Sequence, residues 1–316
     1  MTATGPAVTV VEVAPRDGLQ NEKVELTTAQ KRELVSRAVD FGARRVEVTS
    51  FVHPRKVPAM ADAEDLVARL PADDGIAYSA LVLNERGLDR AIAAGVGEIN
   101  AVVHCTDTFS ERNQGTDIDG GVGIWHRIAR TAREAGVSAN LTIAVAFGCP
   151  FEGEVSLERL RSILARVLEE APTELSLADT IGVAVPRDVH ERFAVAADLV
   201  PSDMSLRAHF HDTRSCGIAN ALAAVESGVT ILDSSLGGIG GCPFAPNATG
   251  NIATEDLAYA LDRTGVAHGL DTEALQDAGA WLEGVFGRRL PSAVLHAGGF
   301  GTPRRGGVTV PIPPPR

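Results

Sequence analysis

The chain repeats one unit along most of its length, and this repeat limits the possible folds more than any other feature. Each unit is a short run of apolar and β-branched residues followed by a longer amphipathic stretch, which is the pattern of a strand and a helix. The eight strands are expected to end near Val13, Val48, Val82, His104, Ala146, Ala178, Phe210 and Asp233. The helices are expected at residues 28–41, 61–70, 84–94, 121–135, 157–170, 186–200, 214–227, 254–263 and 272–286.

Consecutive strand ends lie about 31 residues apart, which is the length of one strand–helix unit. Eight such units predict an α/β chain that folds as a closed (β/α)8 TIM barrel. The alternative is a doubly wound sheet, which usually carries a glycine-rich phosphate fingerprint after its first strand. No such fingerprint follows Val13, so the barrel is favoured. We therefore expect one TIM-barrel domain over residues 1–297, with a short helical extension at its end, and a Gly/Pro-rich tail over residues 298–316.

Composition and charge exclude several classes of function. The net charge of −12 and the aromatic content of 4% disfavour nucleic-acid binding, which needs basic and stacking side chains. No apolar run reaches the length of about 18 residues that a membrane span requires. No signal-peptide pattern opens the chain and the four cysteines have no disulfide or metal spacing, so we expect a cytoplasmic protein with reduced thiols.

Polar residues gather where the predicted strands end, which is where barrels of this type carry their chemistry. In chain order these residues are Arg16, Asp17, Glu47, Asp179, His209, His211, Cys242 and Asn251. Because the carboxyl ends of all the strands meet at one mouth of the barrel, we expect these side chains to lie close together.

His209 and His211 are the most informative of these residues. They lie two positions apart on one strand, so their side chains share a face. Two imidazoles at a barrel mouth are a metal-ligand arrangement, although one core histidine and one loop histidine would give the same spacing. Asp17, which a closed ring brings next to the last strand, and the amide oxygen of Asn251 could complete a site, although Asp17 also suits a turn. Two nitrogens and two oxygens favour Mg²⁺ or Mn²⁺ over zinc as the divalent cation.

Arg16 brings a fixed cation to the same mouth, where it could stabilise an oxyanion or a carboxylate. An ion pair with Glu47 is the structural alternative, and both can hold because the carboxylate would fix the guanidinium in place. Cys242 lies among glycines that imply either a tight backbone or a moving loop. Its thiol could act as an acid or a base, or it could be a buried apolar residue. His53 and His104 could contact a substrate or be ordinary loop histidines.

Six segments near the predicted strand ends carry the residues of one known family. They are 11–22 (VEVAPRDGLQNE), 47–52 (EVTSFV), 177–182 (LADTIG), 209–213 (HFHDT), 240–243 (GGCP) and 250–256 (GNIATED). Together they resemble the 3-hydroxy-3-methylglutaryl-CoA lyase family over about residues 8–297. Each segment is weak evidence alone, but the ordered set is specific.

The resemblance implies a TIM barrel that binds a divalent cation and cleaves a carbon–carbon bond of a 3-hydroxyacyl-CoA. The reaction is a retro-Claisen cleavage that gives acetyl-CoA and a 3-oxo acid. By position, the metal ligands of the family match Asp17, His209, His211 and Asn251. The residues that the family uses in or around the reaction match Arg16, Glu47, Asp179, His209 and Cys242. The resemblance also implies a small-molecule acyl-CoA substrate and a homodimer.

Three positions depart from the family and leave the substrate open. The family has an arginine and a tyrosine on the fifth strand near the substrate, whereas this chain has Asn140 and Thr142, and His53 replaces a serine. A lyase for a 3-hydroxyacyl-CoA with a different group at C3 is therefore one alternative. A condensing acyltransferase of the isopropylmalate or homocitrate synthase type and an inactive metal-binding protein are the others. The segments at 18–22 and 240–242 favour the lyase.

Overall fold

Eight parallel strands close into a barrel in the computed structural model, which describes residues 7–72, 75–241 and 250–300. In this described part the strands follow the order β1-β2-β3-β4-β5-β8-β9-β10, and β10 pairs with β1 to close the ring. Their bounds are β1 Thr9–Glu12, β2 Arg45–Ser50, β3 Ala77–Leu81, β4 Glu98–His104, β5 Ser138–Ala144, β8 Glu174–Asp179, β9 Ser205–Phe210 and β10 Ile231–Ser234. The predicted α/β class and TIM barrel are confirmed, and each strand ends within two residues of its expected position.

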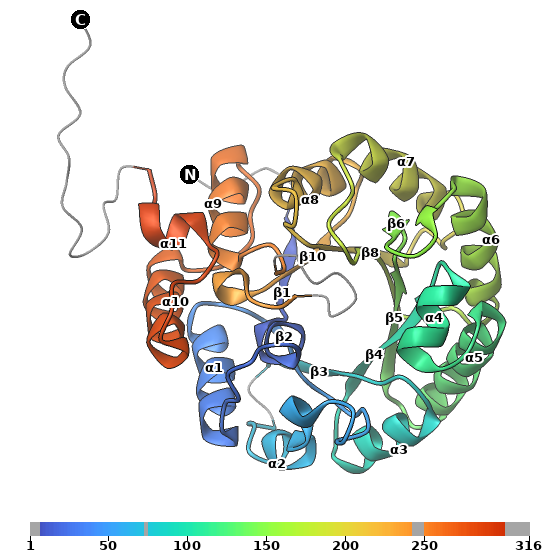
Figure 1. The fold of residues 1–316 in the computed structure, drawn as a ribbon, viewed down its shortest axis with the longest axis horizontal. Helices are drawn as coiled ribbons and strands as arrows, with labels where there is room; N and C mark the ends of the chain where they lie inside the picture. Colours follow the sequence, from blue (N-terminus) through green and yellow to red (C-terminus); the bar gives the residue numbers. More distant parts are fainter. Residues whose placement is uncertain (1–6, 73–74, 242–249, 301–316) are drawn as a thin grey trace, which may run out of the picture.

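Helices follow the strands and form the outer ring of the barrel (Figure 1). The helices between successive strands and after the last one are α1 Thr28–Asp40, α2 Ala63–Val67, α3 Glu85–Ala93, α5 Ile118–Glu134, α6 Leu157–Val167, α7 Pro186–Ala197, α8 Gly217–Glu226 and α9 Thr254–Thr264. Local signals set their ends: the Thr27 hydroxyl caps α1, and Gly42 beyond it takes a φ of +100°. Buried side chains such as Leu34, Trp125 and Phe193 fill the layer between the helices and the strands.

Two helices lie outside the expected ranges, α4 (Asp107–Gln114) and the short α11 (Ala293–Ala297), and another helix begins earlier than expected. The sequence of α4, DTFSERNQ, is almost wholly polar and so lacks apolar periodicity. Helix α5 begins before residue 121 because the Asp117 side chain accepts a hydrogen bond from Gly120 N (2.8 Å) and caps it there. The remaining short elements are the strands β6 Gly148–Cys149 and β7 Gly153–Glu154, the π-helical turn η1 Ala14–Gly18 and the 3₁₀ turns η2 Pro58–Met60, η3 Leu168–Glu170 and η4 Leu236–Gly238.

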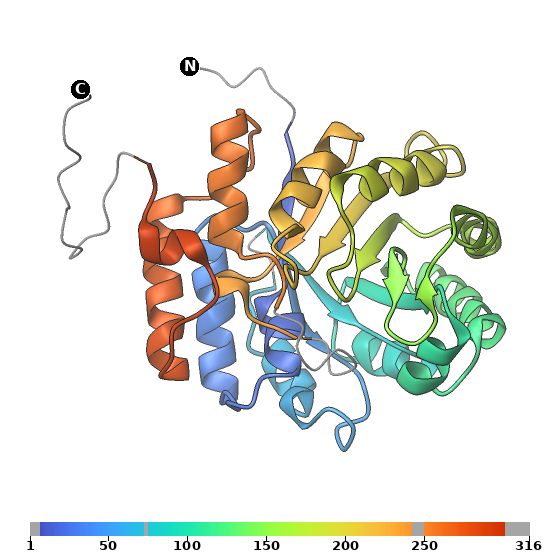
Figure 2. The same cartoon turned by 45° about the horizontal axis from the view of Figure 1, so that its top comes forward.

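Two helices, α10 (Thr272–Phe286) and α11 (Ala293–Ala297), extend the chain beyond the barrel and lie beside α1 and α9 (Figures 1 and 2). Phe41, Leu275 and Leu282 are buried in the apolar cluster that joins them to the barrel. The predicted helical extension is therefore confirmed. The domain boundary after residue 297 stays a prediction, because residues 301–316 lie outside the described residues. None of the described helices is long and apolar enough to cross a membrane.

Glu12 is fully buried at the end of β1. It stabilises the seam of the barrel, which is the junction where β1 pairs with β10. One carboxylate oxygen accepts hydrogen bonds from the backbone N–H groups of Ala14 (2.8 Å) and Leu236 (2.9 Å), and the other accepts one from the Thr254 hydroxyl (2.7 Å). These bonds hold the turns after β1 and β10 and the start of α9 around one group. Burial raises the pKa of Glu12 to about 7, although the hydrogen bonds that it accepts oppose the shift.

Replacing Glu12 with Gln should flatten the dependence of stability on pH. Above its unfolded pKa of 4.5, the folded protein keeps a proton on Glu12 that the unfolded chain has released. The stability from this group is therefore complete below pH 4.5 and is lost as the pH rises to about 7, by up to about 1.4 kcal/mol per pH unit. Urea unfolding of wild-type and Glu12→Gln proteins across this range measures the slope. Glu154→Gln, at an exposed site, is the control, and an unchanged slope in Glu12→Gln would contradict the assignment.

Candidate active site

Arg16 and Asp17 lie in the π-helical turn η1, which follows β1 directly. Turns of this kind are rare and often occur at functional sites. A side chain at Gly18 would place its Cβ 2.8 Å from Ile239 Cγ1, so only glycine lets η1 pack against the turn after β10. The turn brings both polar side chains to the carboxyl-terminal mouth of the barrel.

His209 and His211 share one face of the strand, as their spacing predicts. His209 lies on β9 and His211 directly follows that strand, and the centroids of the two rings are 5.2 Å apart. Phe210 between them points the other way and packs on Phe147, with ring centroids 5.9 Å apart. Both imidazoles therefore face the barrel mouth on the side of Asp17.

Asn251 reaches the same place because residues 250–253 insert between the ends of β9 and β10. Ile252 N donates to Phe210 O (3.1 Å), and Ser235 N donates to Ile252 O (3.0 Å). Asn251 Nδ2 then donates to Asp17 Oδ2 (2.8 Å), although 234 residues separate them. A Cβ at Gly250 would lie 2.1 Å from the carbonyl oxygen of Gly238, so this insertion needs a glycine.

The four predicted metal ligands are thereby brought together. One ligand atom each from Asp17, His209 and His211 lies within 4.8 Å of the others. Asn251 Oδ1 is buried and has no hydrogen-bond partner among the described residues. Such an orphaned oxygen beside a carboxylate and two imidazoles fits a cation that takes oxygen and nitrogen ligands. These residues form a possible metal site of the predicted composition.

The residues around Asp17 keep its carboxylate ionised. Burial alone would raise its pKa, but the charges of Arg16, His209 and His211 and the hydrogen bond from Asn251 hold the pKa well below its usual range. The carboxylate therefore remains ionised and available as an oxygen ligand across the physiological pH range.

Arg16 makes the ion pair with Glu47 that was the structural alternative for it. Its Nε and Nη2 atoms lie 2.8 and 2.6 Å from Glu47 Oε2, and Nη1 lies 2.6 Å from Asp17 Oδ1. Glu47 lies on β2 and is only 1% exposed, so this buried carboxylate holds the Arg16 guanidinium in place. Because Arg16 also lines the mouth cavity, the ion pair and a role in binding an anion can coexist.

Asp179 closes β8 beside the site but does not line the cavity. Its two carboxylate oxygens accept hydrogen bonds from Val183 N and Ala184 N, both at 2.9 Å. Burial raises its pKa, and these two hydrogen bonds oppose the shift. Its neighbours Ala178 and Thr180 do line the cavity. The contacts of Asp179 hold the turn after β8, and its catalytic role stays a prediction.

Arg207 and Asp233 orient His209, and sequence reasoning missed this role. Arg207 is 1% exposed on β9, and its Nε donates to Asp233 Oδ1 on β10 (2.5 Å). The other oxygen of Asp233 lies 3.0 Å from His209 Nδ1, and His209 Nε2 lies 3.8 Å from Asp17 Oδ2. A carboxylate at Nδ1 makes that atom the donor and leaves Nε2 free to act as a ligand. The sequence carried one signal for this role: Arg207 stands at an inward-facing strand position, and a buried arginine needs a buried partner.

The ion pairs continue downward from Arg207 through the barrel interior. Arg207 Nη1 donates to Glu174 Oε1 (3.2 Å), and Arg45 Nη1 lies 2.8 Å from Glu174 Oε2. Arg45 Nη2 lies 2.7 Å from Glu98 Oε1, which also accepts from Asn140 Nδ2 (2.9 Å). Asn140 belongs to this interior layer and not to the cavity wall, which corrects the expectation for it.

The connected charges carry an excess of two negative charges. The connected residues are Glu47, Arg16, Asp17, His209, Asp233, Arg207, Glu174, Arg45 and Glu98. With the histidine neutral, three arginines face five carboxylates in this set. An uncompensated buried charge is costly, and a divalent cation at the possible metal site would balance it.

A cavity of about 150 Å³ opens at the barrel mouth. One side is formed by Arg16, Asp17, His209 and His211, and the other by residues of β3, β4 and β5 that include Thr142. Its volume equals that of about five liquid waters, which suits an acyl group but not a whole coenzyme. His53 is exposed in the loop after β2 and does not line this cavity, so a substrate contact there stays a prediction.

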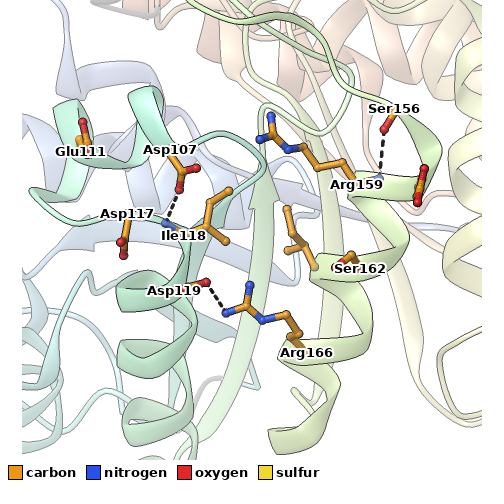
Figure 3. A pocket seen from close by; sticks show the side chains of 11 residues that line it. Asp107, Glu111, Asp117, Ile118, Asp119, Ser156, Arg159, Ser162 and Arg166 are labelled. Atoms are coloured by element: carbon orange, nitrogen blue, oxygen red, sulfur yellow. Dashed lines mark hydrogen bonds and ion pairs between the residues drawn. The ribbon is translucent and has the colours of Figure 1, made fainter.

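A larger hollow of about 770 Å³ lies on the outer flank, between α4, α5 and α6 (Figure 3). Its charged groups are satisfied locally: Arg166 lies 2.7 Å from Asp119, and Asp107 accepts a hydrogen bond from Ile118 N (2.9 Å). None of the predicted site residues in the described part lines it. The mouth cavity is therefore the candidate active site.

Cys242 lies outside the described residues, so its proposed role is untested by the structure. The described residues just before it favour the tight-backbone alternative for the glycine-rich loop. Gly240 has a φ of +101°, and a Cβ there would lie 2.8 Å from Asn251 Nδ2 and 2.9 Å from Asp17 O. A glycine at this position thus lets the loop approach two of the predicted metal ligands.

The HMGL-like family profile matches residues 7–281, which include all eight strands of the barrel. The chain belongs to the HMGL-like family. It is 41% identical over 302 residues to the (R)-citramalyl-CoA lyase of Chloroflexus aurantiacus, with 92% of this chain and 95% of that protein covered. It is 39% identical over 281 residues to the hydroxymethylglutaryl-CoA lyase of Pseudomonas mevalonii, with 89% and 93% covered. The resemblance seen in the sequence is confirmed, and this HMGL-like protein is an enzyme of a carbon–carbon lyase family.

Solved structures agree with this family assignment. An HMG-CoA lyase from Acinetobacter baumannii, in complex with coenzyme A and 3-methylmalate, matches with a TM-score of 0.91 and 34% identity over 99% of this chain and 100% of that one. The HMG-CoA lyase of Bacillus subtilis matches with a TM-score of 0.88 and 36% identity over 92% and 97% of the two chains. The HMGL-like protein therefore shares the whole barrel with these lyases.

The possible metal site predicts a measurable affinity for Mn²⁺. Asp17→Asn should weaken Mn²⁺ binding by at least about 100-fold, because it removes the anionic ligand. Asp233→Asn should weaken it about 10–100-fold, because it releases the orientation of His209. Calorimetric titration of each purified protein with Mn²⁺ measures these affinities. Asp198→Asn, on the exposed end of α7, should bind as the wild type does, and wild-type affinity in Asp17→Asn would refute the site.

The interior ion pairs predict a large effect of one buried arginine. Arg207→Met should lower the free energy of unfolding by about 3–5 kcal/mol, because it leaves Asp233 and Glu174 short of a buried partner. Combining it with Asp233→Asn should cost less than the sum of the two single changes. Urea unfolding of the single and double variants measures this coupling. Arg187→Met, an exposed arginine on α7, is the control, and additive losses would show that the pair is not coupled.

Proposed function

We propose that the protein cleaves the C2–C3 bond of a 3-hydroxyacyl-CoA in a retro-Claisen reaction that requires Mg²⁺ or Mn²⁺. The products are acetyl-CoA and an oxo acid. The observation that carries this proposal is that Arg16 and the ligand group of Asp17, His209 and His211 line one cavity. The names of the relatives, which act on citramalyl-CoA and hydroxymethylglutaryl-CoA, support the choice of an acyl-CoA. A cytoplasmic location and a homodimer, both expected from the sequence, complete the proposal.

The reaction begins with removal of the proton from the 3-hydroxyl group. A divalent cation at the ligand group supplies Lewis acidity, which lowers the pKa of such a hydroxyl. Asp17 and His209 are the two candidate bases, since both face the cavity. Asp233 stabilises a positive charge on the His209 ring through Nδ1, whereas the lowered pKa of Asp17 makes it the weaker base. His209 is the favoured base where its Nε2 is not a metal ligand; where Nε2 ligates the cation, neither ring nitrogen can accept the proton and Asp17 is the remaining candidate.

Bond cleavage then moves two electron pairs. The pair left by the hydroxyl proton forms the new carbonyl at C3, and the C2–C3 pair becomes the enolate of the departing thioester. Arg16 stabilises the enolate oxygen, and Glu47 and Asp17 keep its guanidinium in position. A proton returns to C2 to give acetyl-CoA. Cys242 is the proposed donor of this proton, as the resemblance implies.

The acyl group is proposed to be 3-hydroxy-3-methylglutaryl or a relative with a different group at C3. The relatives named for citramalyl-CoA and hydroxymethylglutaryl-CoA are similar to this chain to nearly the same degree, at 41% and 39% identity. Thr142 lines the cavity where the family has a tyrosine, and its smaller side chain leaves more room on that wall. Both thioesters therefore belong in the test.

The protein with Mg²⁺ or Mn²⁺ should release acetyl-CoA from one of these thioesters, and Arg16→Gln should lower kcat by about 10²–10³-fold. The loss follows from removal of the group that stabilises the enolate oxygen. Mass-spectrometric detection of acyl-CoA products, with and without a chelator, measures the reaction. Arg55→Gln, at an exposed position after β2, is the matched control and should keep full turnover.

The alternatives give different outcomes in the same assay. No cleavage across the panel by the metal-loaded protein would refute the lyase proposal and favour a metal-binding protein without activity. Release of free thiol from acetyl-CoA in the presence of a 2-oxo acid would favour the condensing acyltransferase.

A further inference from the structure

The cavity wall opposite the ligand group carries a buried histidine with one unpartnered nitrogen. His104 ends β4 and lines the cavity together with Asn100 and Val102 of the same strand. β4 lies across the barrel from β1, β9 and β10, whose ends carry the ligand group (Figure 1). His104 is 1% exposed, and its Nδ1 has no hydrogen-bond partner among the described residues.

The His104 ring is held in place and stays neutral. It packs on Phe109, with ring centroids 5.3 Å apart. Burial lowers the pKa of His104 to about 4, although a hydrogen bond with the Asn113 side chain opposes the shift. A neutral imidazole has one donor and one acceptor nitrogen, and Asn113 engages only one of them. Leaving the other nitrogen unpaired and dry costs about 1–3 kcal/mol, a cost that a bound group with a hydrogen-bonding atom would remove.

The rest of this wall offers no second unsatisfied polar atom of the same kind among the described residues that line it. Thr142 Oγ1 donates to Asn100 Oδ1 at 3.1 Å, so these two side chains satisfy one another. Leu81, Leu83 and Val102 supply apolar surface around them. His104 Nδ1 is thus the buried polar atom of this wall that has no partner among the described residues. Asn113 also lines the cavity, and Gln20 Oε1 is a second unpartnered atom, on the side of Arg16.

We propose that His104 is a specificity-determining residue, which forms a hydrogen bond with an oxygen atom on a C3 branch of the substrate. The proposal rests on the lyase function above. When the 3-hydroxyl lies at the ligand group, a C3 branch extends across the cavity of about 150 Å³ toward β4. That branch ends in a carboxylate or a hydroxyl and not in an alkyl group. A site built around a hydrogen bond discriminates strongly against an isostere that cannot form it.

A matched series of thioesters tests this inference. The series consists of 3-hydroxy-3-methylacyl-CoAs whose second C3 substituent is carboxymethyl, carboxyl, 2-hydroxyethyl or propyl. Calorimetry in the presence of a chelator measures binding without turnover. The wild type should bind at least one oxygen-bearing member about tenfold or more tightly than the propyl member. The carboxylate and hydroxyl members show which oxygen the wall selects.

The variants separate the hydrogen bond from the packing. His104→Phe keeps a ring against Phe109 but removes both nitrogens, so the preference should fall to about twofold or less. His104→Leu provides the same test with a smaller side chain if the phenylalanine variant does not fold, as judged by thermal unfolding. His104→Gln, which keeps a hydrogen-bonding side chain, should restore part of the preference. His190→Phe, the same change at an exposed histidine of α7 that does not line the cavity, is the control.

The outcomes are distinct for the two proposals. Loss of the preference in His104→Phe or His104→Leu, but not in His190→Phe, supports the inference. An unchanged preference in those two variants, or tighter binding of the propyl member by the wild type, overturns it. Selective binding that depends on His104, without cleavage of any member after Mg²⁺ or Mn²⁺ is supplied, keeps the inference and overturns the lyase function. Failure of the wild type to bind any member, with Mg²⁺ or Mn²⁺ supplied as well as with the chelator, overturns both.

Discussion

The buried ion pair between Arg207 and Asp233 is the interaction on which the arrangement of the site depends. A guanidinium inside a barrel stays charged only beside carboxylates, and Asp233 and Glu174 meet this need. The same pair keeps the pKa of Asp233 low although burial opposes it, so a negative charge always faces His209 Nδ1. Barrels of this type more often fill their interior with branched aliphatic side chains. Here an ion-pair network fills part of it, and the ligand group at the mouth is the upper end of that network.

The strand pairing that closes the barrel also brings the residues of the site together. Asp17 and Asn251 come from opposite ends of the barrel sequence, and they meet because β1 pairs with β10. Glu12 holds the two turns at that seam through backbone hydrogen bonds, and Gly240 and Gly250 let the loop after β10 come close to η1. A change at the seam would therefore displace two of the predicted metal ligands, Asp17 and Asn251.

The parts of this arrangement that the sequence predicts are those set by periodicity and strand adjacency. The strand ends follow from the repeat, the shared face of His209 and His211 follows from the two-residue period, and the neighbouring strands β1 and β2 place Arg16 near Glu47. The interior network does not follow from either rule. Arg45 and Glu174 are 129 residues apart and meet across the barrel, so only the strand register and tilt bring them together. Helix α4 was missed for the opposite reason, since its polar sequence carries no periodic signal.

The positions of the interior arginines, Arg45 on β2 and Arg207 on β9, determine the charge of the cavity wall above them. Glu174 engages both Arg45 and Arg207 below the cavity, so neither guanidinium faces a ligand there. The wall above them keeps only neutral polar groups, the Thr142–Asn100 pair and His104. In the proposed function, a negative charge on the acyl group would then be balanced mainly at the opposite end of the cavity, by Arg16 and a cation at the possible metal site. We therefore expect the β4–β5 wall to select the acyl group by size and hydrogen bonding.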